Sequence, residues 1–376
     1  MRLSQDTAAT APVDNGYGRA RLWLGISGVG LMVLLAATGL LLLYVSKPVL
    51  ESQPDAYVLA SFVGLYAFIH TPLDWLGGYL LPHRYNRPHP TFWRYLANWS
   101  RGVAVHSICL FACAMGLLFA SSQLGAGGAV IWTMTLSVIL LWLRRPYARL
   151  LARLTPAVKD GVSLMASEDQ GFTGGLDGMT YPRQDVQPQL WHESFPKSQI
   201  EAISQRRAEA GRSGLFARGR LFALVFIMTG SSISASAVGS EGLATAVGVI
   251  QYACAFTLWS FLGLLVLPTL SRNAATTIDH RLTASGTLDE SSINDALNSI
   301  NTLQDAEQRR PAMVETVFHP IRSPSRRQGG HGSSMLAAWD VARITVYMSL
   351  AGLSLLGRAV HCNVGRPALW AYLPSE

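Results

Sequence analysis

Charged side chains are scarce in this chain, and their scarcity is uneven. Only 14% of the 376 residues are Asp, Glu, Lys or Arg, whereas soluble proteins average about 25%. The mean hydropathy is +0.25, and several long windows carry no charge at all. This composition excludes a large soluble globular protein and predicts a membrane protein.

The sequence also lacks the common signatures of catalysis and metal binding. Its four cysteines form no CxxC pair, which excludes a zinc knuckle and a disulfide framework. There is no GxSxG elbow, no serine–lysine signature, no GK[ST] after the glycines at 171–178 and no HExxH. His192-Glu193 begins like HExxH, but Pro196 stands where the second His is required.

The net charge of +7 has a simple physical explanation. The arginines cluster beside the apolar segments, where they would meet anionic lipid headgroups. No recognised nucleic-acid-binding motif accompanies them. We therefore expect a lipid bilayer with anionic headgroups as a partner, and no nucleic acid.

Six segments are apolar enough to cross a membrane, which takes about 20 residues. The first is too long for the core of a signal peptide, so an uncleaved span is expected. The fourth and fifth are short and require tilt or local thinning of the bilayer. The six segments are 22–45, 57–81, 102–121, 128–143, 221–238 and 243–268.

Arginine counts in the loops predict the orientation of these spans. The region before the first span and the loops after the second, after the fourth and before the fifth are rich in arginine. The opposite loops hold only Lys47, with no basic residue at 122–127 or 239–242. We therefore expect a multi-pass integral membrane protein of a bacterial inner membrane or an equivalent one, with both termini cytoplasmic.

This topology divides the chain into consecutive regions. We expect an all-α polytopic protein whose cytoplasmic part is mainly helical, with at most a small β-hairpin near 171–190. The segment 336–360 has a charge-free core of only about 14 residues, which favours a buried or interfacial helix over a seventh span. The expected regions are a disordered cytoplasmic tail (1–20), a four-helix transmembrane region (21–143), a cytoplasmic block (144–220), a transmembrane hairpin (221–268), a second cytoplasmic block (269–319), a linker (320–334) and the C-terminal helix with its tail (335–376).

One span contains an ionisable pair. His70 and Asp74 are four residues apart and share a helix face. Such groups are expensive inside a bilayer, so they predict either a proton relay or ion site, or a structural pair that bonds within the pair and to a neighbouring helix. Pro72 and Gly77-Gly78 predict a kink and close helix packing in the same span.

Three short motifs follow one another in the second half of the chain. They read FPKSQIEAISQRRAEA at 195–210, LSRNAATTID at 270–279 and FHPIRSPSRR at 318–327. Their order, spacing and intervening membrane hairpin resemble the integral-membrane zinc metallopeptidases that include the CAAX prenyl protease and the bacterial heat-shock membrane peptidase. The retained motif residues are Ser271, Arg272, Asp279, His319 and Pro320. The resemblance covers roughly 170–330 and implies that both cytoplasmic blocks belong to one peptidase-like domain.

The residues that the family uses for zinc and catalysis are replaced. Arg206 stands at the first His ligand, Arg207 at the catalytic Glu, Ala210 at the second His and Ala275 at the third-ligand Glu. Arginine stays protonated and offers no lone pair to Zn²⁺. We therefore expect no catalytic residue, no bound metal and no cofactor at this site.

Three hypotheses about function remain. The first is a pseudopeptidase that binds another membrane protein, regulates an active homologue or forms part of a membrane complex. Its Arg206, Arg207 and Arg212 would form either a cationic groove with Glu209 or a solvated helix face. The second is an active zinc peptidase with displaced ligands, and the third is a transporter or channel that uses His70 and Asp74. The displaced ligands would come from His192, Glu193, Asp279, His280 and His319, with His280 and His319 as the first candidates for a metal.

Overall fold

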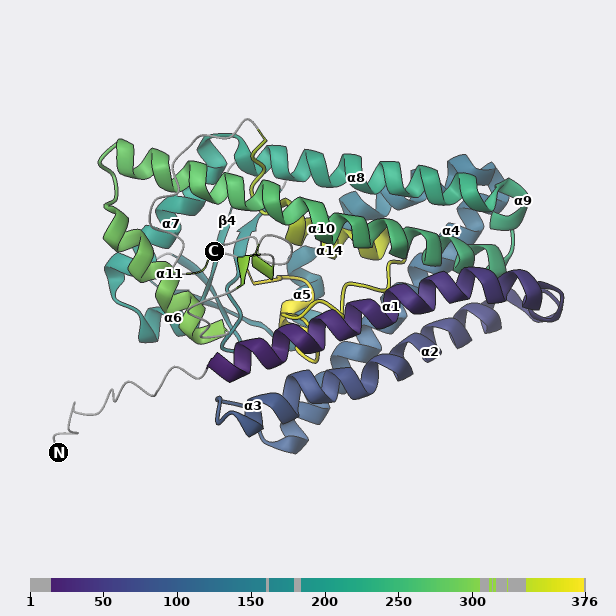
Figure 1. The fold of residues 1–376 in the computed structure, drawn as a ribbon, viewed down its shortest axis with the longest axis horizontal. Helices are drawn as coiled ribbons and strands as arrows, with labels where there is room; N and C mark the ends of the chain where they lie inside the picture. Colours follow the sequence, from purple (N-terminus) through teal and green to yellow (C-terminus); the bar gives the residue numbers. More distant parts are fainter. Residues whose placement is uncertain are drawn as a thin grey trace.

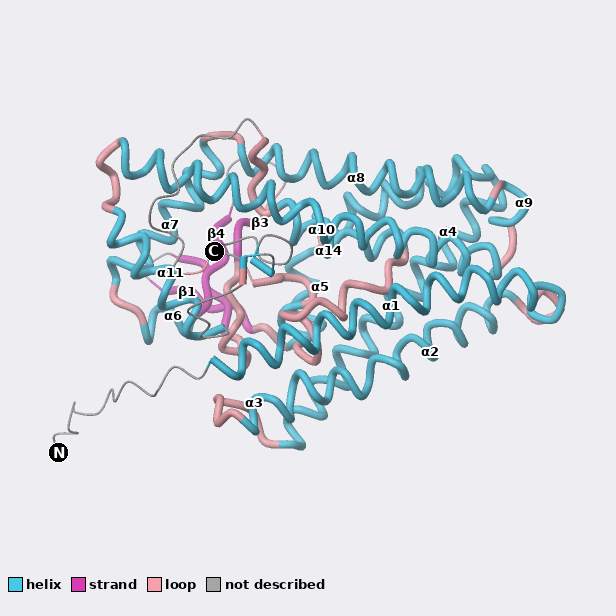
Figure 2. The backbone as a smooth tube through the Cα atoms, viewed as in Figure 1, coloured by secondary structure: helices cyan, strands magenta, loops and turns pink. Residues whose placement is uncertain are grey.

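The computed structural model describes residues 15–159, 162–178, 184–304, 311–312, 314–315, 323 and 336–374. The described chain is mostly helical, with one small sheet (Figures 1 and 2). The long helices run along the long axis of the molecule, and the sheet and several short helices gather at one end.

Among the described residues, five helices are long and apolar enough to cross a membrane, so the chain is a multi-pass membrane protein. They are α1 (Asn15–Leu50), α2 (Asp55–Trp75, continued by η1 Leu76–Leu80 and α3 Leu81–Arg84), α4 (Phe92–Trp142), α8 (Leu215–Val238) and α10 (Ala246–Ala284). Helix α1 already begins at Asn15, so the expected disordered tail to residue 20 is too long by several residues; residues 1–14 lie outside the described part.

Helix α4 is a hairpin of two helical arms. Gly125 has a non-helical backbone (φ 59°, ψ −145°), in a region that favours glycine. The indole N–H of Trp132 donates to the carbonyl oxygen of Cys113 at 3.1 Å. In a straight helix these positions would be about 28 Å apart, so the chain reverses at Gly125. The break lies inside the uncharged loop expected at 122–127.

Loops that are distant in sequence meet at the end of the bundle opposite the sheet (Figure 1). The Asp55 carboxylate accepts from the backbone N–H of Ala246 at 2.8 Å. The Ser240 hydroxyl accepts from the N–H of Ala126 at 3.2 Å, next to the α4 reversal. The α1–α2 connection, the α4 reversal and α9 (Ser240–Leu243) therefore share one end.

The other end carries the sheet and the short helices. The strands β1 (Thr155–Lys159), β2 (Val162–Ala166), β3 (Gly175–Asp177) and β4 (Gln184–Pro188) form one sheet in the order β1-β2-β4-β3. Only the β2–β4 pair is parallel. The sequence predicted at most a hairpin near 171–190, and the structure corrects this because β1 and β2 lie upstream. The short helices near this end are α5 (Arg144–Ala152), α6 (Gln189–Ser194), α7 (Lys197–Arg212) and α11 (Glu290–Gln304).

The C-terminal segment 336–374 threads back through the molecule. It contains α14 (Val341–Met348), η2 (Ser349–Gly352) and η3 (Pro367–Leu369), joined by irregular chain that is buried nearly throughout. Irregular backbone inside a membrane bundle must be bonded to protein groups, since lipid offers none. Two such bonds are the Leu355 N–H to the Thr257 hydroxyl at 3.1 Å and the Arg144 guanidinium to the Ala371 carbonyl at 2.9 Å.

Candidate functional site

Helices α7 and α10 bring the peptidase-like motif positions together. Arg206 on α7 donates through Nε to Asp279 Oδ1 at 2.6 Å and through Nη2 to Asp279 Oδ2 at 3.2 Å. This bidentate pair matches the planar fork of a guanidinium to a carboxylate. The arginine side chain is 1% exposed, and that of Asp279 is 30% exposed.

The neighbouring arginine binds the sheet. Arg207 Nη1 donates to Asp185 Oδ1 at 2.7 Å and to the Val186 carbonyl at 3.2 Å, both on β4. Its Nη2 donates to the Thr173 carbonyl at 2.8 Å, and its guanidinium lies 5.2 Å from the centre of the Trp191 ring. Arg207 therefore holds α7 against the sheet.

The two alanines of the motif belong to the apolar interior. Ala210 and Ala275 are part of one buried cluster with Ile203, Ile278 and Trp339. The predicted solvated face is wrong for Arg206 and Arg207, which are both buried. It fits Arg212, which is 65% exposed and pairs with Glu209 at 3.4 Å. Asp279 and Asp185 neutralise the two buried arginines, so they do not form an open cationic groove.

The other predicted site residues are dispersed. Ser271 accepts from the backbone N–H of Ala342 at 3.1 Å, and Arg272 donates to the Glu315 carbonyl at 2.9 Å. His280 is exposed on α10, whereas His192 on α6 bonds to Gln187 at 2.7 Å. His319 and Pro320 lie outside the described residues. Within the described part of the chain, no three His, Cys, Asp or Glu side chains gather in a metal-binding group.

His70 and Asp74 are both fully buried, but their contacts differ. Asp74 pairs with Arg358 of the C-terminal segment and accepts from the Trp99 indole at 3.0 Å and the Gly365 N–H at 2.9 Å. His70 packs edge-on against Tyr66, with 4.6 Å between ring centres. Asp74 thus anchors the C-terminal segment to α2.

Two glycines allow this close approach. A Cβ on Gly78 would lie 2.1 Å from the carbonyl oxygen of Gly365, and one on Gly365 (φ +71°) would lie 2.0 Å from that of Asp74. The glycine pair at 77–78 therefore serves close packing, as its spacing indicated. The partner is the irregular C-terminal chain and not a helix.

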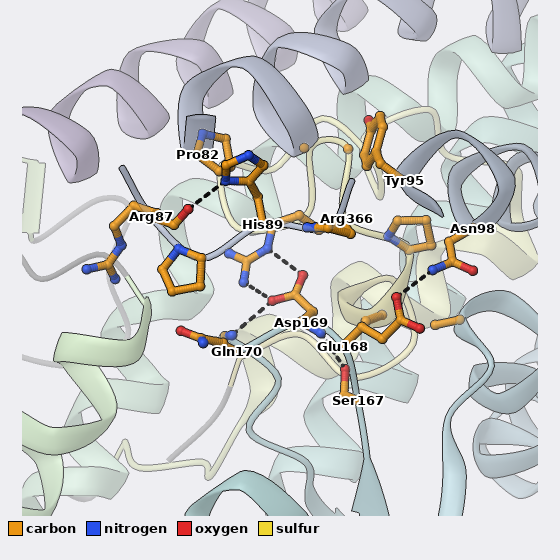
Figure 3. Close-up of a pocket in the computed structure, with 18 of the residues that line it drawn as sticks. Pro82, Arg87, His89, Tyr95, Asn98, Ser167, Glu168, Asp169, Gln170 and Arg366 are labelled. Atoms are coloured by element: carbon orange, nitrogen blue, oxygen red, sulfur yellow. Dashed lines mark hydrogen bonds and ion pairs between the residues drawn. The ribbon is translucent and has the colours of Figure 1, made fainter. Parts of the chain in front are cut away.

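A pocket that is partly open to solvent lies where the helices meet the sheet end (Figure 3). Its lining comes from six parts of the chain: α1, the α2–α4 region, the end of α5, the loop at 167–171, the end of α11 and the C-terminal segment. Tyr17, Tyr95 and Trp99 supply aromatic surface, and Glu168 and Asp169 supply carboxylates. The walls therefore mix apolar, aromatic and charged side chains, and fixed polar groups of this kind orient the ligand in binding pockets.

Each pocket carboxylate is held by an arginine. Arg366 binds Asp169 with both arms of its guanidinium, one of them at 2.7 Å (Figure 3). Burial raises the pKa of Asp169, but the Arg366 charge and hydrogen bonds from Arg366 and Gly171 outweigh burial and leave that pKa below its ordinary value. Glu168 accepts from Arg94 at 2.7 Å and from Asn98 at 2.8 Å.

Sequence reasoning did not find this pocket, because no local pattern links residues from six separate segments. The nearest signal was the arginine-rich loop at 84–101, which predicted only the side of the membrane. No protein-family model matches the sequence, and no curated protein matches it either.

Proposed function

We propose that this chain is a membrane pseudopeptidase with six crossings and cytoplasmic termini, whose role is to bind another membrane protein or to form part of a membrane complex. It keeps a metallopeptidase-like arrangement of α7, the α8–α10 hairpin and the motif on α10. It performs no zinc hydrolysis at the motif positions.

Support for six crossings comes from counting the two arms of α4 separately. The connections after α1, within α4 and between α8 and α10 then lie at one end of the bundle (Figure 1). The loops with the most arginine lie at the other end, beside the sheet. The excess of arginine in cytoplasmic loops makes the sheet end the cytoplasmic one.

The observation that carries the loss of hydrolysis is the Arg206–Asp279 pair. The nitrogen–oxygen distance in this pair is 2.6 Å. Arg206 is a permanent cation, and the resemblance implies a zinc-ligating histidine at its position. A second cation follows at the general-base position, and apolar packing encloses both alanines. Zn²⁺ at these positions would meet two guanidinium groups and no lone-pair donor from any of the four side chains.

The test of the scaffold is to rebuild the missing motif. The variant carries Arg206→His, Arg207→Glu, Ala210→His and Ala275→Glu, which restores both His ligands, the base and the third ligand. We expect it to hold about one more zinc per chain than its parent, as measured by mass spectrometry on detergent-purified, dialysed protein.

A matched control moves the two new histidines to neighbouring positions of α7, omits the new glutamate at 207 and keeps the new glutamate on α10. It combines Gln205→His, Ala208→His and Ala275→Glu. If the rebuilt variant elutes as a folded species and holds no more zinc than this control, the metallopeptidase-like scaffold is refuted.

The unmodified protein separates the enzyme alternative from the proposal. We expect no hydrolysis of casein by the purified chain, with or without added zinc. Hydrolysis that a chelator abolishes and that His280→Ala removes would favour an active peptidase with displaced ligands.

A further inference from the structure

Two imidazoles meet on the exposed loop that follows the second long helix. His83 lies on α3, and His89 follows it after a tight turn. The distance from His83 Nδ1 to His89 Nε2 is 3.0 Å, and the two ring planes are nearly perpendicular at 88°. Both side chains are exposed, and His89 also lines the pocket (Figure 3).

Hydrogen bonds and prolines restrain the backbone of the loop between His83 and His89. Three backbone hydrogen bonds close it, from Tyr85 N–H to Leu81 at 3.1 Å, from Asn86 N–H to His83 at 3.2 Å and from Arg87 N–H to Pro82 at 2.9 Å. Asn86 takes the left-handed conformation (φ 50°), which asparagine tolerates better than most residues. Prolines at 82, 88 and 90 restrict the backbone further.

The loop is also fixed to the rest of the protein. The Arg87 guanidinium donates to the Thr302 carbonyl at 2.7 Å, at the end of α11. The Tyr79 ring lies 6.1 Å from the centre of the His83 ring, stacked on it, and 6.0 Å from that of His89, edge-on. The two imidazoles are therefore preorganised before any ligand arrives.

The proton positions follow from one hydrogen bond. His89 Nδ1 lies 2.8 Å from the carbonyl oxygen of Arg87. Because a carbonyl only accepts, Nδ1 carries the proton and Nε2 keeps its lone pair. A histidine whose second nitrogen donates to a backbone carbonyl has the arrangement usual for metal ligands.

We propose that His83 Nδ1 and His89 Nε2 bind one divalent transition-metal ion of the zinc, nickel or copper class. Metal–imidazole bonds of about 2.0–2.1 Å place two neighbouring ligand nitrogens about 3 Å apart, as they are here. Imidazole nitrogen suits these ions. On binding, His83 moves its proton from Nδ1 to Nε2, so both rings stay neutral and the metal replaces the bond between them.

With only two protein ligands, the remaining coordination positions of the ion are open. They are filled by water or by an oxygen atom of a molecule bound in the adjoining pocket. The site shares no residue with the peptidase-like motif, so it goes beyond the proposed function and does not depend on it.

The test is calorimetric titration of zinc chloride into the full-length, detergent-purified chain without a polyhistidine tag. We expect one ion per chain in the wild type, and at least tenfold weaker binding in His83→Ala and in His89→Ala. His280→Ala, which removes another exposed histidine, serves as the matched control and should bind zinc as the wild type does.

Either of two results would overturn the site. One is wild-type binding that both loop variants retain, and the other is a wild type that takes up no zinc at millimolar concentration. The thermal unfolding of each variant in the same detergent separates loss of the ligand from loss of the fold. Zinc uptake by the rebuilt α7–α10 motif is measured against its own parent, so the two proposals fail independently.

Discussion

Two buried arginine–aspartate pairs in this protein sit in different surroundings. In the helix bundle, Asp74 and Arg358 are both 0% exposed. At the sheet end, Arg206 is equally buried, but Asp279 remains 30% exposed. The first pair joins α2 to the C-terminal segment, and the second joins α7 to α10.

The difference follows from the solvent that each pair can reach. Asp74 is fully buried, so the protein supplies its further donors from Trp99 and Gly365. The Arg358 guanidinium lies over the rings of Tyr66 and Trp370, at 5.5 and 4.7 Å. Asp279 can complete its hydrogen bonds with water. Loss of one partner should therefore cost more in the bundle than at the sheet end.

The largest expected effect is that of Asp74→Ala. It leaves the Arg358 cation buried without a counter-ion, and such a loss costs about 3–5 kcal/mol. We expect the free energy of unfolding in detergent to fall by this amount. The double variant Asp74→Leu with Arg358→Leu should recover part of the loss, because no charge then remains. A single variant as stable as the wild type would mean that the pair does not hold the C-terminal segment.

The second effect is that of Arg206→Ala. We expect the free energy of unfolding to fall by about 1.5–3 kcal/mol, which is what hydrogen bonds to charged groups contribute. The loss is smaller than for Asp74→Ala because water can hydrate the remaining Asp279. A double-mutant cycle with Asp279→Ala measures the coupling directly. Arg212→Ala on the exposed side of the same helix is the matched control and should change stability by less than about 0.5 kcal/mol. If Arg206→Ala and Arg212→Ala lowered the free energy of unfolding equally, the burial of Arg206 would not explain its contribution.

The third effect depends on pH and concerns Asp169. Because its pKa in the folded protein is lowered, the Arg366 pair stabilises the fold fully above the unfolded value of about 3.9. That contribution is lost as the pH falls through the folded pKa. The stability advantage of the wild type over Asp169→Asn should thus be constant near neutral pH and disappear in acid. An advantage that grows on acidification would contradict this assignment.

The smallest effect is expected for the exposed pair at the pocket rim. Arg94 is 64% exposed and Glu168 42% exposed, and exposed ion pairs contribute about 0–1 kcal/mol. Arg94→Ala should leave the unfolding temperature nearly unchanged in 0.15 M salt. If Arg94→Ala lowered the stability as much as Arg206→Ala does, the burial of an ion pair would not determine how much it stabilises this protein.

The membrane helices were predictable because their signal is local. A charge-free window of about 20 residues can satisfy its backbone in lipid only as a helix. The break between the third and fourth segments was predicted as a loop at 122–127, and the structure places the reversal at Gly125. The sheet was predicted only in part, because β1 and β2 are five residues each and carry little periodic signal.

The candidate sites were less predictable, because their partners are distant in sequence. The sequence drew attention to Arg206 and Arg207 only through a resemblance, which stays a prediction. It could not indicate that Asp279 and Asp185 neutralise the two arginines. His83 and His89 are six residues apart, and only the folded turn brings their nitrogens together.

The sequence by itself determined that this chain is a multi-pass membrane protein and where its long apolar segments lie, because both depend on residue types within short windows. The tertiary structure alone decided the course of the C-terminal segment. Its apolar residues reveal that it is buried, whereas its position depends on Asp74, Gly78 and Asp169, each about 200 or more residues away. Such contacts form only when the helices are already packed, because both charges and backbone must find partners where water is absent.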